Sequence, residues 1–237
     1  MDDESEELVF HFSLTPSLSV LLALFFTEAR QNEGRRPYPW VTPRLEMISF
    51  GSGVVINVSD NILPMLRKMA EGRTRDEVFW APFVYGPNSY YLPDLERIAP
   101  LAKPDGFEYE LVEEQNIHKL YQHEGFEYVL HYGGDSPFPE MLIALAKHMG
   151  EVAGMASAHA GCKTLRSINV DVLPPYRRKG LASALVNMLT MEVLNRGYVP
   201  YYFTSESNIH SLRAAIRAGY SPSWIHCYKT RLDDFPI

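Results

Sequence analysis

The feature that most constrains this sequence is a strand–helix–strand pattern between residues 167 and 204. "SINVDV" (Ser167–Val172) and "VPYYFT" (Val199–Thr204) are typical of strands, and the segment between them has apolar residues at helical spacing. One buried helix face is predicted by the i, i+3, i+4, i+7, i+11 positions Ala182, Leu185, Val186, Leu189 and Val193. Such a unit crosses over right-handed and pairs its two strands in parallel.

The start of this helix carries an unusual concentration of cations. "LPPYRRKG" places Arg177, Arg178 and Lys179 directly before Gly180. A helix leaves its first N–H groups unpaired and is partially positive there, so a glycine entry without a Cβ lets the backbone surround an anion such as phosphate. A solvated basic turn beside a structural helix fits these residue types equally well.

Composition limits the partners and the location. The 237 residues carry a net charge of −7, so no overall positive field attracts nucleic acid or an anionic membrane. The apolar run Leu18–Phe26 is shorter than the ~20 residues that span a bilayer, and the acidic start is unlike a secretory signal. Two cysteines, Cys162 and Cys227, make no disulfide framework, so a cytoplasmic protein with reduced thiols is expected.

The turn residues of Ala99–Phe107 suggest two domains, residues 1–102 and 103–237. In the first, we expect a buried helix over Ser17–Gln31, a hairpin over Arg44–Val58 and a helix capped by Asp60 that runs to Ala70. In the second, strands are expected at 108–112, 141–147, 151–158, 165–173, 199–204 and 224–230, with helices at 180–195 and 208–218.

Two segments resemble a known family. "RRKGLA" matches the [Arg/Gln]-x-x-Gly-x-[Gly/Ala] signature of the GNAT superfamily of acyl-CoA-dependent N-acyltransferases, and it follows "VDVLPPY" as the family's strand does. "TSESNIHSLRAAIRAGYSP" is similar to the family's Asn-led helix that ends in Gly-aromatic. The resemblance covers roughly residue 103 to the end, and the sequence also resembles a bacterial group of this family with an extra N-terminal module.

The resemblance implies an α/β fold with a mixed, centrally splayed sheet flanked by helices, plus a smaller N-terminal α/β module. Acetyl-CoA is the implied cosubstrate, with its pyrophosphate at the motif. The implied cofactor-binding residues are Arg177, Arg178, Lys179, Gly180, Leu181, Ala182 and Ser183 at the motif, and Val170, Val172 and Asn208 along the pantetheine arm. The main chain of Val170, Asp171 and Val172 is expected to face the thioester, and Asn208 could equally be a helix N-cap.

The sequence departs from the family where proton transfer is needed. Ala215 stands where many members have the tyrosine that protonates the thiolate, and Leu165-Arg166-Ser167 stands where others have a glutamate base. Substitutes near the expected cleft are Asp171, Tyr201, Tyr202, Glu206, His210 and Ser211. Of these, we carry forward Asp171, Glu206 and Ser211 as candidate catalytic groups.

Two functions follow from these patterns. The first is an acetyl-CoA-dependent N-acetyltransferase that acts on a small primary amine by direct attack in a ternary complex, with the N-terminal module shaping the acceptor site. The second, suggested by the missing tyrosine and glutamate, is a non-catalytic acyl-CoA-binding sensor or interaction module. No metal is expected, because the spacing of His118 and His123 separates them on a helix. No nucleic acid or membrane partner is expected, and a homodimer is compatible with the sequence.

Overall fold

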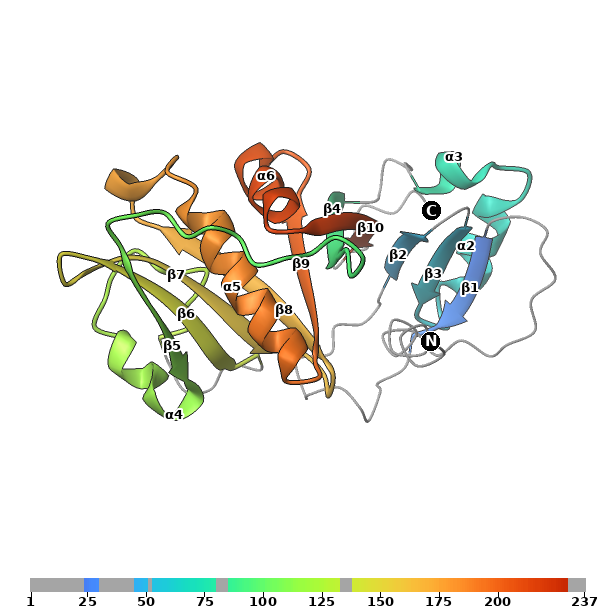
Figure 1. Ribbon diagram of the computed structural model, residues 1–237. Helices are drawn as coiled ribbons and strands as arrows, with labels where there is room; N and C mark the ends of the chain where they lie inside the picture. The colour runs from blue at the N-terminus through green and yellow to red at the C-terminus, as the bar shows by residue number, and fades with distance from the viewer. Residues whose placement is uncertain (1–23, 30–44, 51–52, 80–84, 133–137, 230–237) are drawn as a thin grey trace. The chain divides into compact units, whose positions relative to one another are not determined.

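The computed structural model describes residues 24–29, 45–50, 53–79, 85–132 and 138–229 (Figure 1). The chain forms two compact units, one made of residues 1–90 and 223–237 and the other of residues 91–222. This division by compactness differs from the boundary that the turn residues predict at 102–103, which stays a prediction.

The first unit is built on the strand order β1-β3-β2-β10. Its strands are β1 (Leu24–Glu28), β2 (Leu45–Phe50) and β3 (Gly53–Val58), and its helices are α2 (Leu63–Ala70) and α3 (Arg75–Phe79). The division between the two units falls within β4 (Tyr85–Pro93) and within β10 (Tyr220–Lys229). The expected hairpin is confirmed, because β2 and β3 pair antiparallel from Leu45 opposite Val58 to Phe50 opposite Gly53.

Two expectations for this unit are wrong. Leu24–Glu28, expected to be helical, is a strand that pairs in parallel with β3; a short apolar run fits a buried strand as well as a helix, and the partner strand decides. The remainder of the expected helix over residues 17–31 lies almost entirely outside the described residues. Asp60 does not cap α2, because Ile62 occupies the N-cap position without a side-chain hydrogen bond.

The second unit holds the predicted β-α-β pattern. Its strands are β5 (Glu108–Glu113), β6 (Glu140–His148), β7 (Glu151–Ala160), β8 (Leu165–Val172) and β9 (Val199–Ser205), in the order β9-β8-β7-β6-β5. Its helices are α4 (Glu114–Ile117), η1 (His118–Leu120), η2 (Pro174–Tyr176), α5 (Leu181–Asn195) and α6 (Ile209–Arg217). The result is the expected mixed, open sheet flanked by helices. No helix within the described ranges is long and apolar enough to cross a membrane.

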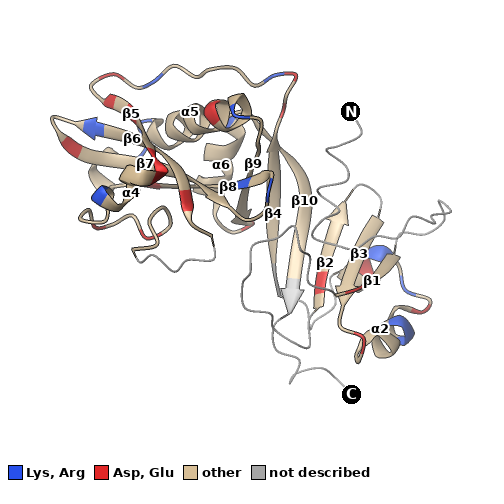
Figure 2. Cartoon of the chain, turned by 90° about the horizontal axis from the view of Figure 1, so that it is seen from below, with Lys and Arg blue, Asp and Glu red and all other residues tan. Residues whose placement is uncertain are grey.

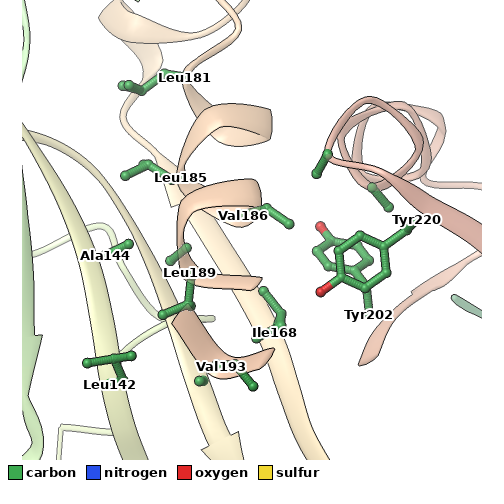
Figure 3. Close-up of a cluster of buried hydrophobic side chains, with 14 of the residues drawn as sticks. Leu142, Ala144, Ile168, Leu181, Leu185, Val186, Leu189, Val193, Tyr202 and Tyr220 are labelled. Carbon is green, nitrogen blue, oxygen red and sulfur yellow. The ribbon is translucent and has the colours of Figure 1, made fainter. Parts of the chain in front are cut away.

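The apolar stripe of α5 makes the main core of this unit. Leu185 and Leu189 are fully buried, and they pack with Leu142 and Ala144 of β6 and Ile168 of β8 (Figure 3). In Figure 1, α5 runs across the face of β6, β7 and β8. The helix ends where the sequence predicts, because Gly197 adopts the left-handed conformation, with φ 77°, soon after its last residue.

The opposite face of the sheet is covered by residues 117–130. Side chains alternate between the two faces of a strand, so Ile143 and Leu145 of β6 point away from α5. They pack with Ile117, Phe126 and Leu130 in a second buried cluster. Among the described residues, both faces of the sheet are therefore covered.

Candidate active site

The parallel strands β8 and β9 separate in the middle of the sheet. Their pairing runs from Leu165 opposite Val199 to Ile168 opposite Tyr202 and stops there. β8 continues to Val172 and stays paired with β7, from Ile168 opposite Ala158 to Val172 opposite Gly154. The backbone edge of β8 that faces β9 therefore has no partner in β9 beyond Ile168. The term splay is used below for this gap between residues 169–172 of β8 and the end of β9.

Backbone alternation identifies which groups face the splay. The N–H of Leu173 donates to the carbonyl of Ala153 at 3.0 Å, so alternate residues back along β8 direct their N–H and C=O groups toward β7. Val170 and Val172 occupy the other positions and direct theirs into the splay. Nε of Arg177 accordingly donates to the Val172 carbonyl at 2.8 Å. The main chain of Asp171, expected to face the thioester with its neighbours, faces β7 because successive residues alternate.

The loop after β8 brings two residues with left-handed backbone conformation to the start of α5. Arg178 and Gly180 both have positive φ, 62° and 82°, and Gly180 is the N-cap of the helix without a side-chain cap. Left-handed residues alternating with others turn successive N–H groups to one side, as in known anion-binding loops. The first N–H groups of the helix, from Leu181 to Ser183, have no intrahelical partner. We call residues 178–183 the anion loop.

The anion loop has the space and charge that an anion requires. A Cβ placed on Gly180 would approach nothing closer than Pro104 Cγ at 3.9 Å. The side chains of Arg177, Arg178 and Lys179 are exposed, whereas Leu181 is buried in the core, so the helix residue presents only its backbone. The loop can therefore bind a phosphate through N–H groups, with cations at its rim.

Asp171 lies beside the splay on the sheet face opposite α5. It is paired with Met155 of β7, which belongs to the second buried cluster. Its Oδ2 accepts a hydrogen bond of 2.9 Å from the backbone N–H of Tyr128. Burial raises the pKa of this carboxyl, the Tyr128 N–H opposes the shift, and the charge of Glu127 adds to it. The contact with Tyr128 joins segments 43 residues apart, and no sequence pattern predicted it.

Tyr202 and Ser211 meet across the other side of the splay. The Tyr202 hydroxyl lies 2.8 Å from the Ser211 hydroxyl, and Tyr202 is almost fully buried in the last paired position of β9. Burial raises the pKa of Tyr202, the bond to Ser211 lowers it, and the negative charge of Asp171 raises it. The sequence placed one of the adjacent tyrosines in the core. The structure assigns this position to Tyr202 and leaves Tyr201 half-buried.

The other candidates are less closely involved. Asn208 caps α6 through a 3.1 Å hydrogen bond from the Ser211 N–H to its side-chain oxygen, as the N-cap alternative expected. Glu206 and His210 are exposed. Ala215, at the family's tyrosine position, is fully buried. Arg166, near the family's glutamate position, donates to the backbone carbonyls of residues 162, 163 and 165 and therefore has a structural role.

The sequence and the fold are similar to those of known proteins. The sequence matches the model of the acetyltransferase (GNAT) family over residues 101–220. No curated protein matches it. Similar solved structures include a GCN5-related N-acetyltransferase-like protein from Streptococcus suis 89/1591, with 18% identity, a TM-score of 0.48 and coverage of 81% of this chain and 87% of that one.

Two further solved structures are similar at the same level. A GCN5-related N-acetyltransferase from Kribbella flavida has 17% identity, a TM-score of 0.47 and coverage of 66% of this chain and 63% of that one. An acetyltransferase of the GNAT family from Colwellia psychrerythraea has 12% identity, a TM-score of 0.45 and coverage of 62% and 57%. Since the family model spans half of the sequence and contains β8, the anion loop and α6, the chain belongs to the GNAT acetyltransferase family, whose shared chemistry is acyl transfer.

Proposed function

We propose that this protein is an acetyl-CoA-dependent N-acetyltransferase that acts on a small primary amine. The observation that carries the proposal is the anion loop, with Arg178 and Gly180 at positive φ, directly beside the splay. A pyrophosphate on the N–H groups of the loop directs the attached arm along the unpaired edge of β8. The acyl group then lies at Val170 and Val172.

The chemistry needs three contributions from the protein. The Val170 N–H, directed into the splay, is placed to polarise the thioester carbonyl, which gains negative charge as the amine nitrogen attacks. Asp171 takes the proton that the amine loses as the C–N bond forms. The C–S bond then breaks, and the thiolate receives a proton from the Tyr202 hydroxyl, which Ser211 reprotonates from solvent. Glu206 is exposed and precedes α6, and no hydrogen bond or ion pair to another described residue supports a catalytic role for it.

The acceptor class is inferred from charge. The net charge of −7 and the carboxylate of Asp171 favour a cationic amine over an anionic acceptor. Basic and acidic residues are interspersed along the second unit in Figure 2, which does not support nucleic acid as a partner. The free thiols of Cys162 and Cys227 are consistent with the reducing cytoplasm.

A non-catalytic acyl-CoA-binding module is the second candidate. It is favoured by Ala215, because a fully buried methyl group cannot replace the hydroxyl of the family's usual acid. The two candidates share the anion loop and differ only in proton transfer, so binding and turnover must be measured separately.

The test of both candidates is Gly180→Glu compared with Gly197→Glu. Both glycines are exposed and have positive φ, and at both positions an added Cβ would meet no atom closer than 3.9 Å, so both variants carry similar backbone strain. Only the first places a carboxylate in the anion loop. Binding of acetyl-CoA, measured by calorimetry, should weaken at least tenfold in Gly180→Glu, about 1.4 kcal/mol, and remain near wild type in Gly197→Glu.

Turnover is then measured as thiol release from acetyl-CoA with a panel of small amines, amino acids and polyamines. Release by wild type and Gly197→Glu, but not by Gly180→Glu, establishes the enzyme and names its acceptor class. Binding without release from any amine favours the non-catalytic module. Equal acetyl-CoA affinity in wild type and Gly180→Glu would refute the anion loop as the cofactor site in both cases.

A further inference from the structure

A second group of chemically capable side chains lies away from the splay. His131, Glu140 and His159 each offer one donor atom, and these atoms lie within 4.8 Å of one another. His131 follows Leu130 of the second buried cluster, Glu140 begins β6, and His159 lies one residue before the end of β7. We propose that these three side chains bind a divalent transition-metal ion of the zinc class.

The geometry is close to that of a bound ion. Nδ1 of His131 lies 3.1 Å from Oε1 of Glu140. Tetrahedral ligands at about 2.1 Å from a zinc ion are roughly 3.4 Å apart. The Nδ1–Oε1 distance in this pair is therefore close to the distance between two ligands of one ion. The longest donor separation in the group, at most 4.8 Å, must shorten by up to about 1.4 Å. The His131 side chain is 37% exposed and has room to rotate for this adjustment.

The charges of the group call for a cation. Glu140 is 6% exposed, and among the described residues its only ion-pair partner is His131. Glu140 Oε1 also accepts a hydrogen bond from the His131 backbone N–H, and Oε2 accepts one of 3.4 Å from the Tyr121 hydroxyl, but both donors are uncharged. A buried carboxylate without a permanent cation is costly. A divalent ion would provide the missing charge.

His159 is oriented as a metal ligand requires. It is 1% exposed, and hydrogen bonds at both ring nitrogens fix its orientation. Its Nδ1 donates to the Phe138 carbonyl at 3.0 Å, which leaves the lone pair on Nε2. That lone pair now accepts from the Ser157 hydroxyl at 2.5 Å, and metal binding exchanges this bond for a coordinate bond. A carbonyl that orients a ligating histidine is the usual arrangement around zinc.

The position of the group indicates a structural role for the ion. His159 pairs with Ser167 of β8, four residues before Asp171. At about 3.3 Å per residue, the group lies roughly 13 Å along the strand from Asp171. An ion at this distance cannot polarise the thioester. It would instead attach the segment that covers the second buried cluster to β6 and β7.

The experiment measures zinc binding to the full chain without a histidine tag, after treatment with a chelator. Calorimetry and metal analysis after dialysis are performed on wild type, His131→Ala, Glu140→Gln and the control His118→Ala. His118 and His131 are both exposed, so neither alanine variant disturbs a core. Wild type and His118→Ala should retain about one zinc ion per chain. His131→Ala and Glu140→Gln should bind at least tenfold more weakly.

Thermal melting gives a second readout that does not depend on acyl transfer. Zinc at a hundredfold excess over its Kd should raise the melting temperature of wild type by about 5–10 °C, and that of His131→Ala by much less. The absence of zinc binding by wild type, or equal binding by wild type and His131→Ala, overturns the proposal and leaves the group as a His131–Glu140 ion pair. If Glu140→Gln does not fold, the comparison of His131→Ala with His118→Ala still decides.

Discussion

Asp171→Asn is the substitution that most directly tests the proposed chemistry. Asparagine has nearly the same volume as aspartate, and its amide oxygen can still accept the 2.9 Å hydrogen bond from the Tyr128 N–H. The substitution therefore removes the ability to take a proton while keeping the local geometry. The anion loop, which lies beyond η2, is unchanged.

The expected loss is that of one general base. Such a group contributes about 10²–10⁴-fold to the rate, or roughly 2.7–5.5 kcal/mol of activation free energy. We expect kcat to fall by this factor, with the Kd for acetyl-CoA unchanged. Because burial raises the pKa of Asp171, the wild-type rate should fall as the pH drops through a value above the ordinary range for aspartate. The Asn variant should lack this step.

In contrast to its effect on the rate, Asp171→Asn should not lower the stability of the fold. The folded pKa of Asp171 is raised above its unfolded value, so the folded state binds this proton more tightly. Ionisation of Asp171 therefore costs stability as the pH rises through the interval between the two values, and the full cost is present above the folded pKa. At neutral pH the Asn variant should melt at the same temperature as wild type or higher. The advantage should disappear at acidic pH.

The assay combines thiol release across a pH series with thermal melting of both proteins at each pH. Glu206→Gln is the matched control, because it removes an exposed carboxylate near α6 by the same chemical change. Its rate should stay within a few-fold of wild type. A kcat for Asp171→Asn within threefold of wild type would refute the assignment of the base, and a lower melting temperature at neutral pH would refute the burial argument.

Two further predictions concern Tyr202 of β9 and Asn187 of α5. Tyr202→Phe removes the hydroxyl that bonds to Ser211 and should lower kcat by about 100-fold. The control Tyr220→Phe loses a comparable buried hydrogen bond to Thr190 and should leave kcat near wild type. Equal effects of the two variants on kcat would contradict the proton-transfer role of Tyr202. Asn187→Leu leaves the Leu101 N–H and the carbonyls of residues 99 and 218 unpaired, which should cost about 3 kcal/mol and lower the melting temperature by about 6–12 °C in a thermal scan. The exposed control Asn195→Leu should shift it by less than about 2 °C, and an equal shift in both would show that the buried bonds contribute nothing.

The second unit was largely predictable because its signals are local. The stripe of α5, the alternation of β6 to β8 and the glycine after α5 depend on residues close together in the chain, and each appears in the structure within one or two residues of its expected place. Leu24–Glu28 was mispredicted because a five-residue apolar strand has no periodicity that separates it from a helix. Its pairing with β3 is a contact across about thirty residues.

The features of the proposed site were likewise predictable only where they depend on residues close together in the chain. Gly180 and its cations are contiguous, so the sequence alone indicated an anion-binding helix start. The burial of Asp171, the direction of its main chain and the approach of Tyr202 to Ser211 depend on strand register. His131, Glu140 and His159 are likewise scattered in sequence, and only the pairing of β6 with β7 brings the latter two together. The sequence by itself determined most elements of the second unit and indicated the anion loop, because helix periodicity, strand alternation and helix-start chemistry are local. The tertiary structure decided which side chains share an environment, because burial and pKa depend on neighbours distant in the chain.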